Sequence, residues 1–247
     1  MKNLLVAQSG GPTSAINATL AGVVENALSS PSVDRIYGSI NGIQGVLTEN
    51  LIDLKTKLTN VSELDLLCQT PASALGSCRV KLKDPAVCAD EYETIISVLR
   101  KYNIDCFIYI GGNDSMDTVD KLSKYLNAKG ITDITVVGAP KTIDNDLCGT
   151  DHCPGFGSAA KYIGTTFAEL ERDCHVYATK AVTIVEVMGR DAGWLTAASC
   201  LARANGAKGP DFIYLCEVPF SIDTFLKDVK AKLEKQDAVI IAVSEGV

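Results

Sequence analysis

The sequence predicts an α/β protein with two doubly wound, largely parallel sheets, helices on both faces of each sheet, and an incomplete second domain. Short, nearly continuous apolar runs recur along the chain, as expected for strands buried on both faces. Each run leads within three residues into glycine or proline, which marks a turn at its end. The runs are Leu4–Ala7, Cys106–Ile110, Ile134–Ala139, Val182–Val187, Phe212–Cys216 and Ala238–Val243.

Stretches with helical periodicity follow four of these runs, at Ser14–Ala27, Ser115–Asn127, Gly193–Ala204 and Ile222–Glu234. Strands that alternate with helices predict parallel pairing through crossover connections. We expect the chain to pass from the first sheet to the second between Cys148 and Gly157. No helix follows the last run, so we expect the second domain to be truncated on its C-terminal side.

Composition excludes several classes of protein. Of 247 residues, 47% are hydrophobic and 21% are charged, so the chain can bury a core. No apolar run is long enough for a signal peptide or a membrane span, and we expect a cytoplasmic protein without a membrane partner. The net charge of -7 argues against a nucleic-acid partner. The nine cysteines form no CxxC pair, so no disulfide framework is expected.

Two glycine loops lie between predicted strands and helices. In Gln8–Thr13 and Gly111–Ser115, backbone N–H groups and a helix N-terminus can together bind an anion. Taken alone, the first loop favours a tight structural turn over an anion site. In the second, the aspartate and the serine are also the residues of an ordinary helix cap.

The loop Pro140–Asp146 carries a stronger chemical signal. Directly after a predicted strand it gathers the cation Lys141, the hydroxyl of Thr142 and the carboxylates of Asp144 and Asp146. Phosphoryl transfer needs a carboxylate to accept a proton and cations to hold phosphate charge. This loop contains both kinds of group.

A third kind of loop, Met188–Gly193, places Arg190 beside a glycine and suits a sugar phosphate or its hydroxyls. A capped helix start with a surface salt bridge explains the same residues. Arg79, alone in a polar turn, is by itself typical of a solvated surface residue.

In combination, these motifs resemble the phosphofructokinase family in their order and approximate spacing. PKTIDND at 140–146 and VEVMGR at 185–190 are the most specific, and the glycine loops accompany them. The resemblance extends from Leu4 to the last predicted strand. It implies a donor domain at 1–155 that binds the phosphoryl donor with Mg²⁺, and a fructose 6-phosphate domain at 156–247.

The resemblance also implies roles for individual residues. Asp144 matches the general base that takes the proton from the 1-hydroxyl of fructose 6-phosphate, and Asp146 supports it and the metal site. Thr142 and Lys141 complete the catalytic loop. The sugar phosphate is then bound by Thr142, Asp144, Met188, Gly189, Arg190 and Glu217.

On the donor side the resemblance points to Gly11, Arg79, Gly112, Asp114, Ser115 and Lys141. ATP-using members have glycine where this chain has Asp114, and commonly glycine where it has Lys141. Asp114 would fill the space of the nucleotide, while Lys141 can bind the charge of bare pyrophosphate. The pair is the pattern of pyrophosphate-dependent members, and the resemblance then implies a reversible enzyme of glycolysis and gluconeogenesis.

Three departures from the family pattern qualify this expectation. Asn113 stands at a usual metal-ligand position, so Mg²⁺ is expected at Asp114 or through water. Ala181 replaces an arginine that reaches a neighbouring subunit's sugar phosphate, and Lys180 is out of register by one residue. The family's closing segment, with a phosphate-binding histidine and arginine, lies outside this sequence, so we expect poor activity from this chain by itself.

We expect a homodimer or homotetramer from the resemblance, and two other functions stay open. One is an ATP-dependent phosphofructokinase. The other, of a different class, is a truncated, non-catalytic chain that binds sugar phosphate or regulates a longer subunit.

Overall fold

A computed structural model describes residues 2–247 and divides the chain into two compact units, one ending at Lys141 and the other spanning Thr142–Val247. We call them unit 1 and unit 2. The boundary expected after residue 155 lies inside unit 2. There the Thr142 N–H donates to the Pro154 carbonyl at 3.0 Å, so the polar loop closes on itself within unit 2. The functions assigned to the two domains stay predictions.

Unit 1 contains a five-stranded sheet in the order β3-β2-β1-β4-β5. Its strands are β1 (Lys2–Gln8), β2 (Val33–Ser39), β3 (Leu51–Asp53), β4 (Ile104–Gly111) and β5 (Thr135–Pro140). All neighbours pair in parallel except β2 and β3. Because Gln8 is paired with Ile110 and Gly111 with Pro140, the loops after β1, β4 and β5 leave from one edge of the sheet.

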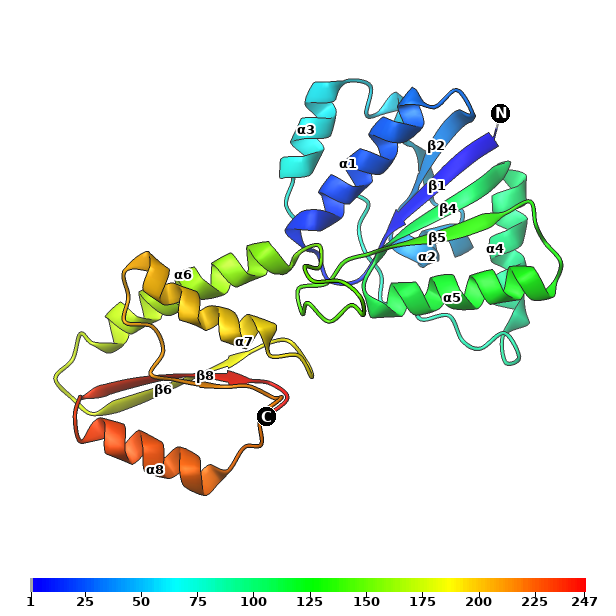
Figure 1. The fold of residues 1–247 in the computed structure, drawn as a ribbon. Coiled ribbons are helices and arrows are strands. Elements are labelled where there is room, and N and C mark those ends of the chain that lie inside the picture. Colours follow the sequence, from blue (N-terminus) through cyan, green and yellow to red (C-terminus); the bar gives the residue numbers. More distant parts are fainter. Residues whose placement is uncertain (1) are drawn as a thin grey trace. The chain divides into compact units, whose positions relative to one another are not determined.

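Helices cover both faces of this sheet (Figure 1). One face carries α1 (Ser14–Ser29), η1 (Leu54–Thr56) and α3 (Val61–Gln69); the other carries α2 (Gly42–Leu47), α4 (Ala89–Lys101) and α5 (Asn113–Ala128). In β1, Leu4 and Val6 face the first cluster of helices, whereas Leu5 and Ala7 face the second. Alternation across a sheet buried on both sides explains the unbroken apolar runs.

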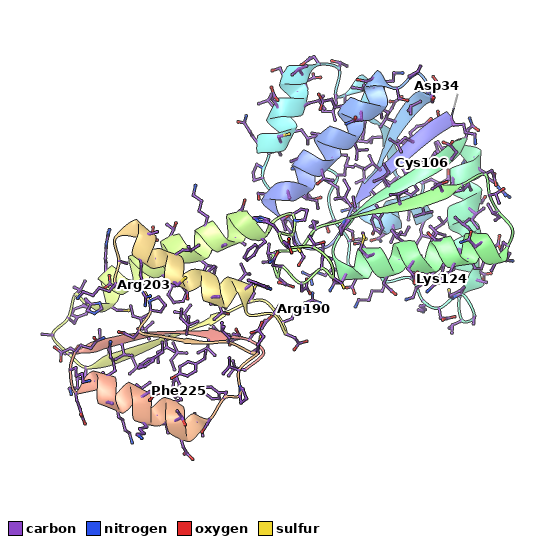
Figure 2. All side chains as sticks on the ribbon, viewed as in Figure 1. Asp34, Cys106, Lys124, Arg190, Arg203 and Phe225 are labelled. Carbon is purple, nitrogen blue, oxygen red and sulfur yellow. The ribbon has the colours of Figure 1, made fainter. Side chains whose placement is uncertain are left out.

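Unit 2 is built around a three-stranded parallel sheet in the order β6-β8-β7. The strands are β6 (Ala181–Val187), β7 (Phe212–Tyr214) and β8 (Ala238–Ser244). One face packs against α6 (Phe156–Cys174), α7 (Trp194–Ala198) and η2 (Ser199–Asn205), the other against α8 (Ile222–Leu233). Figure 2 shows Phe225 on the side of α8 that faces the sheet.

The predicted fold class, parallel sheets with helices on both faces, is confirmed in both units. None of the helices in residues 2–247 combines the length and the apolar character needed to cross a membrane. All nine cysteines are free thiols.

Two helical glycines of unit 1 give a matched test of its packing. A Cβ at Gly45 in α2 would lie 2.0 Å from the Ile40 carbonyl oxygen, whereas a Cβ at Gly22 in α1 would meet nothing within 4 Å. Gly45→Ala should therefore lower the free energy of unfolding by about 1–3 kcal/mol. Gly22→Ala should raise it by up to about 1 kcal/mol, because alanine is the better helix former. Urea unfolding followed by circular dichroism measures both, and effects of the same sign would contradict this packing.

Candidate functional site

The first glycine loop, after β1, is fastened by hydroxyl groups. Gly10 has a φ of +78°, and its carbonyl accepts a hydrogen bond from Ser77 Oγ at 2.6 Å. Ser9 Oγ donates to the Cys78 carbonyl at 3.0 Å. These bonds hold the segment that carries the exposed Arg79 against the loop. The loop leads into α1, whose N-cap residue Thr13 makes no side-chain cap hydrogen bond, and this suits a helix start that receives an anion.

The second glycine loop, after β4, contains two glycines with different roles. A Cβ at Gly111 would lie 2.1 Å from Ser115 Oγ, so this position must be glycine for the buried serine to fit. Gly112 is the N-cap of α5, and the nearest atom to a Cβ there is the Lys141 carbonyl oxygen, at 3.8 Å. Gly111 is therefore required by packing, while Gly112 leaves room on the loop surface.

Asp114 lies in the first turn of α5 with its side chain exposed. Its Oδ1 is 2.8 Å from Lys81 Nζ, and both side chains are about two-thirds accessible. An exposed pair of this kind adds little to stability. It does place a second cation beside a predicted donor residue. Lys81 was missed from the sequence, because it lies in an irregular segment with no strand or helix to direct it.

Lys141 connects the two glycine loops of unit 1. Its ammonium donates to the Gly11 carbonyl, and its backbone N–H donates to the Gly111 carbonyl at 3.0 Å. The residue is only 4% exposed, and burying a charged amine is unfavourable unless polar groups surround it. Gly11 and Lys141, both predicted to bind the donor, are thus brought together.

The exposed side chains of Asp114 and Asn113 carry oxygen atoms at this edge, of the kind that Mg²⁺ binds. Nowhere in the described part of the chain do three or more His, Cys, Asp or Glu side chains gather as a metal site. Mg²⁺ commonly binds through one or two carboxylates, several waters and the phosphates of a substrate. An exposed single carboxylate fits that mode of binding.

In unit 2, the polar loop after β5 is ordered by its own side chains. Thr142 Oγ1 accepts from the Asp144 N–H at 3.1 Å and donates to Asp146 Oδ1 at 3.3 Å. Asn145, with a φ of +61°, accepts from the Cys153 N–H at 2.8 Å. The threonine therefore holds the backbone of Asp144 and the carboxylate of Asp146, and the asparagine joins the loop to Cys153.

Arg190 bridges these two carboxylates. Its Nε donates to Asp144 Oδ2 at 3.0 Å and its Nη2 to Asp146 Oδ2 at 2.5 Å. Burial opposes the charged form, but the hydrogen bond to Asp144 and the nearby carboxylates outweigh it, so the pKa of Arg190 is raised. Figure 2 labels Arg190 in the loop after β6. The structure thus joins four predicted residues: Thr142, Asp144, Asp146 and Arg190.

The backbone that carries Arg190 is unusual. Gly189 has a φ of +147°, and a Cβ there would lie 2.3 Å from the Ala192 carbonyl oxygen. Arg190 itself has a φ of +52°, in the left-handed region that non-glycine residues seldom occupy. Glu245 Oε1 accepts the backbone N–H groups of both residues, the one from Gly189 at 3.0 Å. Glu245 was missed because its contact with this turn depends on the register of β6 against β8, which the sequence does not give.

Glu217 and Met188 lie in the loops after β7 and β6. Glu217 Oε1 accepts the Gly193 N–H at 2.7 Å, and a Cβ at Gly193 would lie 2.5 Å from Glu217 Oε2. This hydrogen bond lowers the pKa of Glu217. Met188 is 62% exposed. Both residues therefore lie in loops at the carboxyl edge of the sheet of unit 2.

By its fold the chain is a parallel α/β protein, with two glycine loops in unit 1 and a carboxylate–guanidinium cluster in unit 2. The chain belongs to the phosphofructokinase family, whose model, described as "Phosphofructokinase", matches residues 3–247.

Individual relatives agree with this family. The chain is 42% identical to pyrophosphate–fructose 6-phosphate 1-phosphotransferase of Rhodospirillum rubrum, over 99% of this chain and 58% of that protein. It is 31% identical to ATP-dependent 6-phosphofructokinase 3 of Bacteroides thetaiotaomicron, over 97% of this chain and 66% of that protein. A crystal structure of pyrophosphate-dependent phosphofructokinase from Nitrosospira multiformis matches with a TM-score of 0.87 and 41% identity, over 100% of this chain and 61% of that one. The chain thus spans less than two thirds of the length of each of these relatives.

The pKa values of Glu217 and Glu245 predict a pH-dependent stability of unit 2. Backbone N–H donors lower both, chiefly Gly193 for Glu217 and Arg190 for Glu245. A carboxyl whose folded pKa lies below its unfolded pKa stabilises the fold above the unfolded pKa and loses that contribution as pH falls through the folded one. The urea midpoint should therefore fall as the pH drops below about 4.3, the ordinary glutamate pKa.

Glu217→Gln and Glu245→Gln should each flatten this acid-side decline, because glutamine does not titrate. Glu169→Gln, at an exposed position of α6, is the control and should leave the profile unchanged. Urea midpoints measured from pH 3 to 7 for the parent and the three variants test this expectation. An equally steep profile in both variants would show that these hydrogen bonds do not couple to protonation.

Proposed function

We propose that this chain contributes the donor-binding and sugar-binding residues of a pyrophosphate-dependent phosphofructokinase. The observation that carries the proposal is the cluster of Asp144, Asp146 and Arg190, in which two carboxylates and a guanidinium are held at the carboxyl edge of a parallel sheet. Ligands of such sheets bind at that edge. The name of the Rhodospirillum relative gives the same reaction.

In the proposed reaction, Asp144 accepts the proton of the 1-hydroxyl of fructose 6-phosphate as that oxygen attacks one phosphorus of pyrophosphate. A new P–O bond forms to the sugar, the bridging P–O bond breaks, and its electron pair leaves with phosphate. The products are fructose 1,6-bisphosphate and phosphate. Asp144 suits the role because its side chain is mostly buried, and Thr142 fixes the backbone that carries it.

In addition to binding the sugar phosphate, Arg190 is proposed to stabilise negative charge in the transition state. Its planar fork already spans two acidic oxygens, and the same donors can bind a transferring phosphoryl group. Half of the Arg190 side chain is accessible, so a ligand can reach it. The proposed contacts to the sugar phosphate are Thr142, Asp144, Met188, Gly189, Arg190 and Glu217.

Pyrophosphate is the proposed donor, and Lys141 and Asp114 support this choice. The buried ammonium of Lys141 lies under the first glycine loop, bonded to the Gly11 carbonyl, where it adds positive charge to the N–H groups of the loop. Asp114 extends from the start of α5 and occupies space that glycine would leave open. Arg79, Gly112 and Ser115 complete the proposed donor site.

Asp114, with the donor's own oxygens, would hold Mg²⁺, which when bound neutralises charge on pyrophosphate. Lys81 already pairs with Asp114 at 2.8 Å and supplies positive charge at the same place. We also propose a cytoplasmic homodimer or homotetramer, supported by family membership.

Asp144→Asn tests the general base. The substitution should lower kcat by about 10²–10⁴-fold with little change in KM for either substrate, because the amide cannot accept the proton. Asp151→Asn, in the same loop, is the matched control and should keep the parental kcat. A variant Asp144→Asn with more than half the parental kcat would remove this residue from the mechanism.

Donor choice is tested with Asp114→Gly and Lys141→Gly, separately and together. The first should raise kcat/KM for ATP by opening space; the second should weaken pyrophosphate, since a charge-assisted contact contributes about 1.5–3 kcal/mol. Together they should shift the ATP-to-pyrophosphate ratio of kcat/KM at least tenfold, or ~1.4 kcal/mol. Lys141→Met, which keeps most of the volume and removes the charge, separates electrostatics from packing. An unchanged ratio in a folded double variant would mean that the donor is selected by other residues.

A further inference from the structure

The segment Ser244–Gly246 follows β8 and lies against the turn that carries Arg190. Strands β6 and β8 are parallel and in register, with Val187 opposite Ser244. The ladder continues one step further, because the Glu245 N–H donates to the Val187 carbonyl at 3.1 Å. The backbone register therefore brings Glu245 beside the turn at Gly189 and Arg190.

Glu245 and Gly246 both lie against the backbone of Arg190. One carboxylate oxygen, Glu245 Oε1, accepts the N–H groups of Gly189 and Arg190. In addition, a Cβ at Gly246 would lie 2.5 Å from the Arg190 carbonyl oxygen and 3.1 Å from Cys216 Cβ. Glycine is thus required there for the close approach, so the glutamate and the glycine both lie against the turn.

These contacts to the backbone of Arg190 affect the direction of its guanidinium. Left-handed backbone at a non-glycine residue persists only where its surroundings enforce it. Two N–H groups that converge on one carboxylate oxygen are charge-assisted hydrogen bonds, which are stronger than neutral ones. The conformation that they hold is the one in which the Arg190 side chain reaches Asp144 and Asp146.

We propose that Glu245 is a positioning residue for the phosphoryl transfer: it fixes the backbone of Arg190 and so aims the guanidinium at the reacting groups. This inference rests on the proposed function, in which Arg190 acts on the transferring phosphoryl group. Glu245 acts through Arg190 and contributes to kcat more than to the KM of pyrophosphate, because the proposed donor contacts belong to unit 1.

The test is a double-mutant cycle between Glu245 and Arg190, read by single-turnover transfer from radiolabelled pyrophosphate. Glu245→Ala should lower the transfer rate at least tenfold, and Glu245→Gln, which keeps an acceptor oxygen without the charge, should fall between it and the parent. In an Arg190→Ala background, Glu245→Ala should change the rate less than twofold. Glu234→Ala, at an exposed position after α8, is the control and should have no effect in either background.

A carboxylate that only stabilises the fold gives a different result, because its loss would reduce the rate by the same factor in both backgrounds. That outcome would overturn the proposal. If Glu245→Ala does not fold, the same cycle with Glu245→Gln distinguishes the positioning role from a purely structural one.

A second readout separates this proposal from the proposed function. Glu245→Ala should move the Arg190 Nε–H resonance in ¹⁵N spectra toward that of a solvated arginine. Arg203, whose Nε donates to the Lys208 carbonyl at 3.1 Å, is the internal reference and should not move (Figure 2). If Arg190→Ala keeps the parental rate, the proposed role of Arg190 in transfer fails, and the spectrum still tests whether Glu245 orients it. An unmoved Arg190 resonance would overturn the positioning role.

Discussion

The bridge from Arg190 to Asp144 and Asp146 is the interaction on which the candidate site of unit 2 depends. These carboxylates are two residues apart, with side chains only 14% and 25% accessible, and they repel each other unless a cation lies between them. The guanidinium meets this need with separate donors for each, and it ties the loop after β5 to the loop after β6. Polar contacts from Thr142 within the first loop and from Glu245 to the second hold the two ends of this bridge.

In unit 1, Lys141 has a comparable role with different chemistry. Its ammonium bonds to a backbone carbonyl at Gly11, and its N–H bonds to Gly111, so one residue joins both glycine loops. Lys141 and Thr142 are consecutive, yet contacts assign them to different units. The motif PKTIDND thus contains the end of one compact unit and the start of the next. Its cation contributes to the glycine loops, and its carboxylates contribute to the cluster with Arg190.

Periodicity predicted much of the fold because strands buried on both faces leave continuous apolar runs. It missed β2, α2, α3, α4 and α6, along with the short antiparallel β3 and the short helix η1. Strand β2 begins with Val33-Asp34-Arg35, which breaks the apolar pattern. Only its second half, Ile36 to Ser39, is mostly buried. The predicted strand Phe212–Cys216 ends at Tyr214, because the chain turns there toward Glu217.

The motifs predicted that the carboxylates and Arg190 belong to one site. Two further residues, Glu245 and Lys81, could not be predicted from motifs. Glu245 becomes visible only when the register of β6 against β8 is known, since nothing in the sequence says which residues of parallel strands lie opposite each other. The signal that could have found it is a charged residue just past the end of a strand, the place where such sheets bind ligands. Lys81 had no comparable signal, because its direction depends on the irregular segment that contains it.

For binding of the proposed donor, the net charge of the chain also matters less than the arrangement of charges near the glycine loops. At physiological salt, charges separated by more than about 8 Å are largely screened. A net charge of -7 spread over 247 residues therefore opposes an anion only weakly at any one place. Near the glycine loops of unit 1 the local balance differs, with Lys141 buried against Gly11 and Lys81 paired to Asp114. An acidic protein can bind a highly charged anion at such a place, provided that its few cations are fixed by backbone contacts, as Lys141 is.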